Sequence, residues 1–307
     1  MDTSQLARCL EKTAGARRLE DVSLASVRGN DARSWLNGQI SNDLAPSRSG
    51  HALYAVAPSA KGKILADMWV LDHGDMFWMS VPKETHHSLL EHLSKYIIME
   101  DVDIAPAEDH ELWSLQGPRA HEVAKAVGID GVERYACERL GPCGVDFIVP
   151  SSQSQDVQSL LTRALASVEG ALVSQAAWEL VRLRNGVPQF GIDFDHRHFP
   201  QEAGIKGRAV SFKKGCYVGQ EAIAMLEHRG KLKQRLVGIS ASSSTTLAVG
   251  QPLLDSAHNE SGAVTSAVYD RDQDGWVGLA YVAYPALEAG DIIQTTKGEP
   301  ITIRSAH

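Results

Sequence analysis

The chain has 307 residues, of which 43% are apolar, and a formal net charge of -8 at pH 7. This length and apolar content predict one large domain and a smaller one, folded without support from metals or disulfides. The negative charge argues against a broad surface for nucleic acid or anionic lipid. Because the cysteines lie far apart and no apolar run has the length of a signal peptide or membrane span, we expect reduced thiols and a cytoplasmic protein. The cysteines are Cys9, Cys137, Cys143 and Cys216.

The first hundred residues alternate predicted strands and helices. A strand is expected over residues 22–27, followed by a helix through Trp35 and Ile40. The segments HALYAVAP, KILADMWVLD and MFWMSVP have the composition of strands, and residues 84–96 return to helical spacing.

A second group of elements begins at ELWSLQGP, a strand that the Gly-Pro pair ends. A helix over 119–127, a strand near 145–149 and a helix over 156–167 follow. Strands and helices in this mixed order predict an α+β core with largely antiparallel sheets.

The sequence changes in character after Lys233. Short runs such as RLVGISA, SGAVTSAVYD and GWVGLAYV are separated by Gly, Asp and Ser, and helical spacing disappears. We therefore predict a main domain at residues 1–235 and a small β-barrel at residues 236–307.

The strongest candidate for chemistry is the segment FKKGCYVGQEAIAMLEHRG, residues 212–230. Cys216 lies between glycines, follows Lys213 and Lys214, and precedes a helical run that starts at Gln220. Ammonium groups and a helix N-terminus favour the thiolate, which acts as a nucleophile, redox group or metal ligand. The same pattern also fits a buried structural cysteine in a turn shaped by glycines.

Residues 214–221, KGCYVGQE, reproduce the KGCYxGQE signature of the YgfZ family, and the sequence resembles that family over nearly its whole length. The family is related to the glycine-cleavage T-protein, an aminomethyltransferase. The resemblance implies a T-protein-like folate-binding core of mixed, largely antiparallel sheets with helices, plus a C-terminal β-barrel. Further similar segments are WLNGQISNDL (35–44), LQGPRA (115–120), NGVPQFGID (185–193) and GAVTSA (262–267).

The resemblance also implies a ligand, tetrahydrofolate or a one-carbon derivative of it. Family members are implicated in the assembly or repair of iron-sulfur clusters in client enzymes, some of which modify tRNA. The expected partners are reduced folate and iron-sulfur client or assembly proteins, without direct contact to nucleic acid or membrane. Cys216 is the expected functional thiol, and we expect it at the edge of the folate cavity. One alternative is a folate-dependent aminomethyl or methyl transferase or a demethylase. Another is a folate-regulated scaffold whose cysteine is structural.

Two positions bear on whether the chain is an enzyme. GKILADM, residues 62–68, is similar to the T-protein segment whose last aspartate acts on the folate, which gives that role to Asp67. Asp67 also fits an ordinary polar residue on a half-exposed strand. T-proteins carry RLEAG where this chain has RLRNG, so Arg184 replaces an acidic residue and argues against classical aminomethyl transfer.

A folate needs an aromatic or apolar slot for its pterin, and cationic or amide partners for its glutamate tail. We expect Trp69 and Tyr217 to form the slot, although packing in the core explains such aromatic residues equally well. The remaining candidates are polar: Asn42, Gln220 and Glu221 for the pterin edges, and Lys213 and Arg229 for the carboxylates.

The segment DFDHRHFP, residues 193–200, holds two carboxylates and two histidines. These residue types also suit a solvated loop, and the cysteines lack the close pairing of structural metal sites. We therefore predict no metal site.

Overall fold

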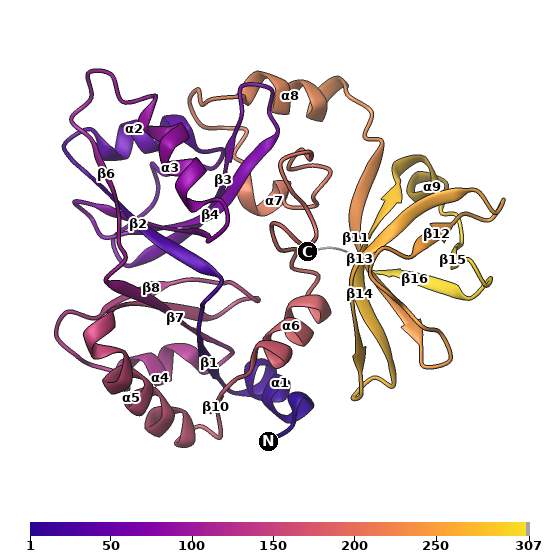
Figure 1. Ribbon diagram of the computed structural model, residues 1–307, viewed down its shortest axis with the longest axis horizontal. Helices are drawn as coiled ribbons and strands as arrows, with labels where there is room; N and C mark the ends of the chain where they lie inside the picture. The colour runs from indigo at the N-terminus through magenta and orange to yellow at the C-terminus, as the bar shows by residue number, and fades with distance from the viewer. Residues whose placement is uncertain (305–307) are drawn as a thin grey trace.

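Within residues 1–304, the part that the computed structural model describes, the chain forms a ten-stranded mixed sheet and a closed six-stranded barrel (Figure 1). Helices pack on the sheet, and a segment of helices and loops lies between the sheet and the barrel. Together these parts confirm the predicted α+β class. Among the same residues, no helix combines the length and apolarity that crossing a bilayer requires.

The sheet consists of β1 (Gly15–Arg18), β2 (Val22–Arg28), β3 (His51–Pro58), β4 (Ile64–Asp72), β5 (Phe77–Pro82), β6 (Asp103–Pro106), β7 (His110–Gln116), β8 (Glu133–Ala136), β9 (Gly144–Pro150) and β10 (Ala171–Leu172). The strand order is β10-β1-β7-β9-β8-β3-β4-β5-β2-β6. Neighbours are antiparallel except β1 with β10 and β3 with β8. The β3–β8 contact is short, with His51 opposite Ala136, so the sheet has two halves that meet there.

The helices are α1 (Thr3–Lys12), α2 (Ala32–Gln39), α3 (His86–Ser94), α4 (Ala120–Ala126), α5 (Ser154–Ala166), α6 (Gln175–Arg184), α7 (Lys206–Ala209), α8 (Gln220–Arg229) and α9 (Tyr284–Ala289), with a 3-10 turn η1 (Ser151–Gln153). Each half of the sheet buries an apolar face under its own helices, α2 and α3 on one half and α4 and α5 on the other. A third core joins α1 and α6 to both halves of the sheet and to the barrel.

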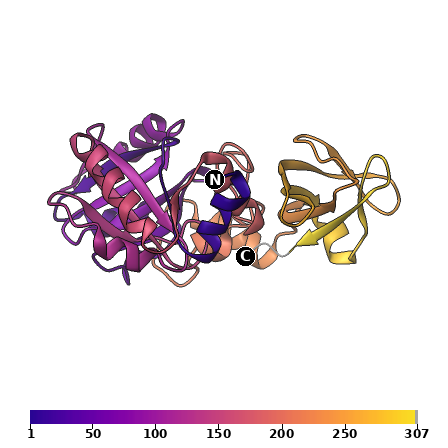
Figure 2. The ribbon, with the colours of Figure 1, turned by 90° about the horizontal axis from the view of Figure 1, so that it is seen from below.

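The barrel contains β11 (Gln234–Ser242), β12 (Pro252–Leu254), β13 (Glu260–Asp270), β14 (Gly275–Ala283), β15 (Ile293–Thr295) and β16 (Pro300–Arg304). It has its own apolar interior, which includes Ile239, Leu253 and Val264. Figure 2 shows it at one end of the molecule, with the middle segment between it and the sheet. The first barrel strand starts at Gln234, next to the domain boundary expected after residue 235. That boundary stays a prediction.

Most elements expected from sequence patterns are present. The strand at 22–27 is β2, the helix through Trp35 is α2, and the run from Gln220 is α8. The expectation that helical structure ends after Lys233 is wrong, because α9 interrupts the barrel strands. Pro285 lies in its first turn, where the missing N–H of proline costs no hydrogen bond.

Candidate functional site

A cavity of about 120 Å³ lies where β3, β4 and β5 meet α6 and α7. The register of the sheet explains which strand residues face it. Asp67 and Trp69 are two residues apart on β4 and therefore point to the same side, and Tyr54 of β3 lies directly opposite Trp69. Trp178 of α6 and Arg208 of α7 line the cavity from the helical side.

Two aspartates line this cavity, Asp21 and Asp67, and Asp67 is the one that lies on β4 beside Tyr54. The Tyr54 hydroxyl donates a hydrogen bond to its Oδ2 at 2.8 Å. Burial, opposed by that hydrogen bond, raises the pKa of Asp67 to about 6. A carboxyl group with a pKa near neutrality exchanges protons readily, so Asp67 is suited to donate a proton to a ligand or to accept one.

Two guanidinium groups extend the aromatic wall. The Cζ atom of Arg139 lies 5.4 Å from the ring centre of Trp69, and that of Arg208 lies 5.8 Å from Trp69 and 5.3 Å from Tyr54. Tyr54 and Trp69 themselves are 5.2 Å apart and tilted by 42°. The cavity thus combines flat apolar surfaces with cations, an arrangement that suits a planar ligand carrying negative charge.

The KGCYVGQE segment lies between α7 and α8 and is tied to α2. The Nζ of Lys214 donates to three carbonyl oxygens at the end of α2, those of Asn37 (2.6 Å), Ile40 (2.9 Å) and Asn42 (2.7 Å). Helix C-termini leave such carbonyls without intrahelical partners, so Lys214 satisfies them. Its ammonium thus ties the segment to the end of α2, and its effect on the thiol of Cys216 stays a prediction.

The glycine after Cys216 in KGCYVGQE is required by geometry. Gly219 has φ +75°, and a Cβ atom there would lie 2.2 Å from the carbonyl oxygen of Ser59. The N–H of Val218 also donates to the carbonyl of Gly38. Cys216 lies just before these two anchors and is exposed to solvent. The alternative of a buried structural cysteine is therefore wrong.

The residues expected to bind folate are divided between two places. Asp67 and Trp69 line the cavity. Asn42 supports its wall, because its amide donates to the backbone carbonyls of Tyr54 and Arg208. The others belong to the thiol segment or to α8 and are not among the lining residues, so their contact with folate stays a prediction: Lys213, Tyr217, Gln220, Glu221 and Arg229.

Cys216 is likewise not among the residues that line the cavity, although we expected it at the edge. Sequence patterns also missed Tyr54, Arg139, Trp178 and Arg208. Only Tyr54 had a usable signal, because alternation in HALYAVAP places it on one face of a strand.

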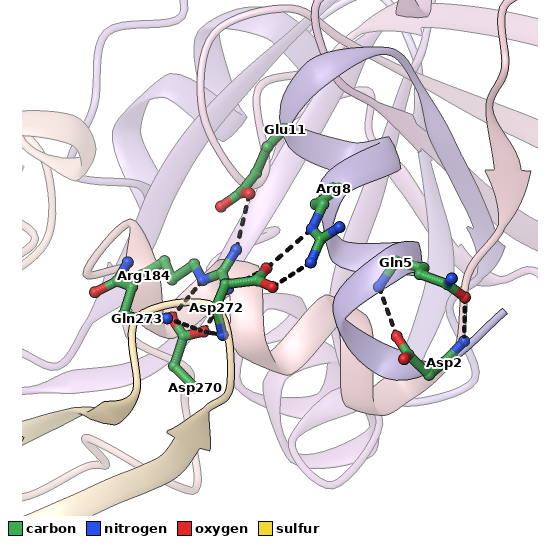
Figure 3. A network of polar contacts seen from close by, with 8 residues as sticks. All are labelled: Asp2, Gln5, Arg8, Glu11, Arg184, Asp270, Asp272 and Gln273. Carbon is green, nitrogen blue, oxygen red and sulfur yellow. Dashed lines mark hydrogen bonds and ion pairs between the residues drawn. The ribbon is translucent and has the colours of Figure 1, made fainter. Parts of the chain in front are cut away.

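Arg184 lies away from the cavity lining. It is buried on α6 and forms ion pairs with Glu11 of α1 and with Asp270 and Asp272 at the β13–β14 turn (Figure 3). The cavity therefore receives no side chain from this position, and the argument that the exchange disfavours classical aminomethyl transfer stays a prediction. Its role is to connect α6 to the barrel.

Comparison with known proteins agrees with this architecture. The family model described as GCVT N-terminal domain matches residues 8–138. The tRNA-modifying protein YgfZ of Shigella sonnei is 26% identical, covering 92% of this chain and 91% of that protein. The protein of the same name from Aliivibrio fischeri strain MJ11 is also 26% identical, covering 87% of this chain and 84% of that protein.

Among solved structures, the glycine cleavage system aminomethyltransferase T from Bartonella henselae superimposes with a TM-score of 0.84. It is 20% identical, and the match covers 99% of this chain and 88% of that one, which shows a common fold. The resemblance of this chain to the YgfZ-type proteins, and through them to the glycine-cleavage T-protein family, is thereby confirmed.

Proposed function

We propose that this protein binds a reduced folate in the cavity beside Asp67 and, in the cytoplasm, supports the assembly or repair of iron-sulfur clusters in client enzymes through Cys216. The observation that carries the proposal is that the cavity and the exposed thiol lie apart from each other. A flat-walled cavity holds a carboxyl group with a raised pKa, and an exposed thiol lies on a firmly anchored segment outside that cavity.

The cavity supports a pterin as the inserted group. An engineered cavity of about 150 Å³ in another protein binds benzene, so a space of this order accepts part of a flat heterocycle while the remainder extends to the mouth. Trp69 and Tyr54 supply the planar walls. Asp67 supplies the polar anchor, accepting hydrogen bonds from ring N–H groups when ionised.

The exposure of Cys216 favours a macromolecular partner over the bound folate as its target. A thiol at the surface, with exposed Gly215 beside it and no atom within 4 Å of where a Gly215 Cβ would be, leaves room for another protein. The curated relatives are named tRNA-modifying proteins, which supports iron-sulfur enzymes that modify tRNA as clients.

A second candidate is a folate-dependent one-carbon transferase or demethylase. The raised pKa of Asp67 favours it, because an acid-base residue works best when its pKa lies near the working pH. Turnover of a methylated or aminomethylated amine with tetrahydrofolate would support this candidate.

Calorimetry with tetrahydrofolate tests the folate part, since a ligand that binds the native state must also raise the unfolding temperature. Complementation of a bacterial strain that lacks its YgfZ-type protein tests the thiol part, with modified tRNA nucleosides and iron-sulfur enzyme activity as readouts. Cys216→Ser is expected to bind folate normally and to fail in complementation. Cys143→Ser is the matched control, and equal complementation by both variants would refute a role for Cys216.

A further inference from the structure

Arg208 differs from the other arginines of the cavity in its lack of a carboxylate partner. Arg139 pairs with Asp146 at 2.7 Å, and Arg182 pairs with Asp193 at 2.6 Å. Among residues 1–304, no carboxylate oxygen lies within ion-pairing distance of Arg208, whose guanidinium donates at 3.0 Å to the backbone carbonyl of Glu138. Most of its donors therefore remain available.

Arg208 lines the cavity, so its N–H donors can reach a ligand that binds there. Its guanidinium lies 5.3 Å from the ring centre of Tyr54, and the residue is half-buried, whereas Arg139, which also lies near Trp69, is more deeply enclosed. Arg208 thus lies where the aromatic wall approaches solvent. A flat ligand stacked along that wall would present its outer end to Arg208.

The backbone that carries Arg208 is held in place before any ligand arrives. The Asn42 amide donates to the carbonyl of Arg208 at 2.8 Å, and the Ser41 hydroxyl donates to that of Ala209 at 2.6 Å. Preorganisation of this kind lowers the entropic cost of binding.

We propose that Arg208 binds the carboxylate tail of the cavity ligand. For the reduced folate of the proposed function, on which this inference rests, that tail is the glutamate. A guanidinium offers paired N–H donors that match a carboxylate, and a charge-assisted pair of this kind is stronger than a neutral hydrogen bond. Lys213 and Arg229, the cations expected to meet the carboxylates, do not line the cavity, whereas Arg208 does.

The test uses the full chain and compares tetrahydrofolate with 6-methyltetrahydropterin, which has the ring but lacks both the p-aminobenzoyl group and the glutamate. We expect the unmodified protein to bind tetrahydrofolate more tightly than the tetrahydropterin. Arg208→Gln should weaken tetrahydrofolate binding about tenfold, as expected for one partly exposed charge-assisted pair, and leave tetrahydropterin binding unchanged. Arg208→Lys should retain part of the preference. Arg163→Gln, which removes an exposed arginine of α5, is the control and should change neither affinity.

The outcomes separate this inference from the proposed function. If the unmodified protein binds neither compound, the proposed folate function fails and this inference fails with it. If it binds tetrahydrofolate and Arg208→Gln does not reduce the preference over the tetrahydropterin, folate binding stands and the role of Arg208 is overturned. Equal weakening of both compounds by Arg208→Gln would also overturn it, because the residue would then shape the ring site.

Discussion

Asp67 is half-buried, and it differs from the fully buried aspartates of residues 1–304 because its hydrogen-bond partner is neutral. The fully buried aspartates elsewhere each pair with an arginine, which compensates for the burial of charge. Asp67 has only the Tyr54 hydroxyl, and its pKa rises accordingly. A group that is costly to ionise and sits in a cavity is a candidate for function. The aspartate–arginine pairs are Asp72–Arg33, Asp146–Arg139, Asp193–Arg182 and Asp270–Arg184.

We predict that Asp67→Asn stabilises the ligand-free protein at neutral pH and weakens folate binding. The folded-state pKa of Asp67 is above its ordinary value of 3.8, so the contribution of this group to stability is fully present below pH 4 and is lost as pH rises through 6. Asparagine keeps an acceptor for Tyr54 and does not titrate. The gain should therefore be near zero at pH 4 and reach about 3 kcal/mol above pH 6.5, measured by denaturant unfolding across this range.

The same variant should bind tetrahydrofolate more weakly by about 1 to 3 kcal/mol at pH 7.5, because the ligand loses a charged acceptor. A variant that is less stable than the parent at pH 7.5 and binds folate equally well would contradict both effects. Tyr54→Phe is a useful companion, since it removes the hydrogen bond and should raise the pKa of Asp67 further.

Cys216 should be the first of the four thiols to react with an alkylating agent at neutral pH. Burial raises the pKa of Cys9 and raises that of Cys137 well above its ordinary value, so both are protected by enclosure and by protonation. Cys143 is half-buried, and Cys216 is exposed. Peptide mapping after brief alkylation measures the order, and faster labelling of Cys143 would remove the basis for choosing Cys216.

At the scale of elements, sequence patterns predicted those whose signal is local. The composition of HALYAVAP and KILADMWVLD indicated β3 and β4, and helical spacing indicated α3 and α5. The cavity was harder to predict, because its walls come from β3, β4, α6, α7 and the β8–β9 loop. Asp67 and Trp69 were found on one strand, whereas Arg208 lies about 140 residues later in the chain and no spacing relates it to them.

Lys214 illustrates a second limit. Its place beside Cys216 in the sequence favoured an electrostatic role, but the acceptors of its ammonium come from residues 37–42. Only the fold brings these segments together. Desolvation lowers the pKa of Lys214 to about 8, so the group remains mostly charged at pH 7.

We predict that Lys214→Met lowers the free energy of unfolding by about 2 to 4 kcal/mol, because it leaves three carbonyls at the end of α2, one buried and two partly buried, without a donor. It should also increase hydrogen exchange in residues 37–42 and 211–219, which the ammonium joins. Lys213→Met is the matched control, since Lys213 is exposed and its side chain has no described partner among residues 1–304. Equal stability of the two variants would mean that the Lys214 contacts contribute nothing.

At the scale of the whole molecule, the barrel is fastened to α6 through two arginines. Arg182 binds Asp193, which in turn accepts from the hydroxyl of Ser266 on β13. Arg184 reaches Asp270 at the end of the same strand (Figure 3). Because Arg182 also lines the cavity, the cavity and the barrel share one helix. The polar contacts of the barrel with α6 therefore begin beside the cavity.

We predict that Arg184→Leu loosens the barrel and destabilises the protein by about 3 to 5 kcal/mol, the usual cost of removing one partner from a buried ion pair. The carboxylate of Asp270 is fully buried and would be left without its cation. Trypsin should then cut faster at Lys231 and Lys233, which lie in the link before β11, and denaturant unfolding should show a lower midpoint.

Arg8→Leu is the control for this change, because Arg8 pairs with Asp272 in the same network but its side chain is 58% exposed. An exposed pair contributes about 1 kcal/mol or less, so Arg8→Leu should leave both cleavage and stability nearly unchanged. Adding Asp270→Leu to Arg184→Leu removes the stranded carboxylate and should recover part of the lost stability, whereas an additive loss would show that the two residues act independently. If Arg184→Leu and Arg8→Leu behave alike, the network does not hold the barrel, and its orientation must depend on the apolar contacts between α6 and β14.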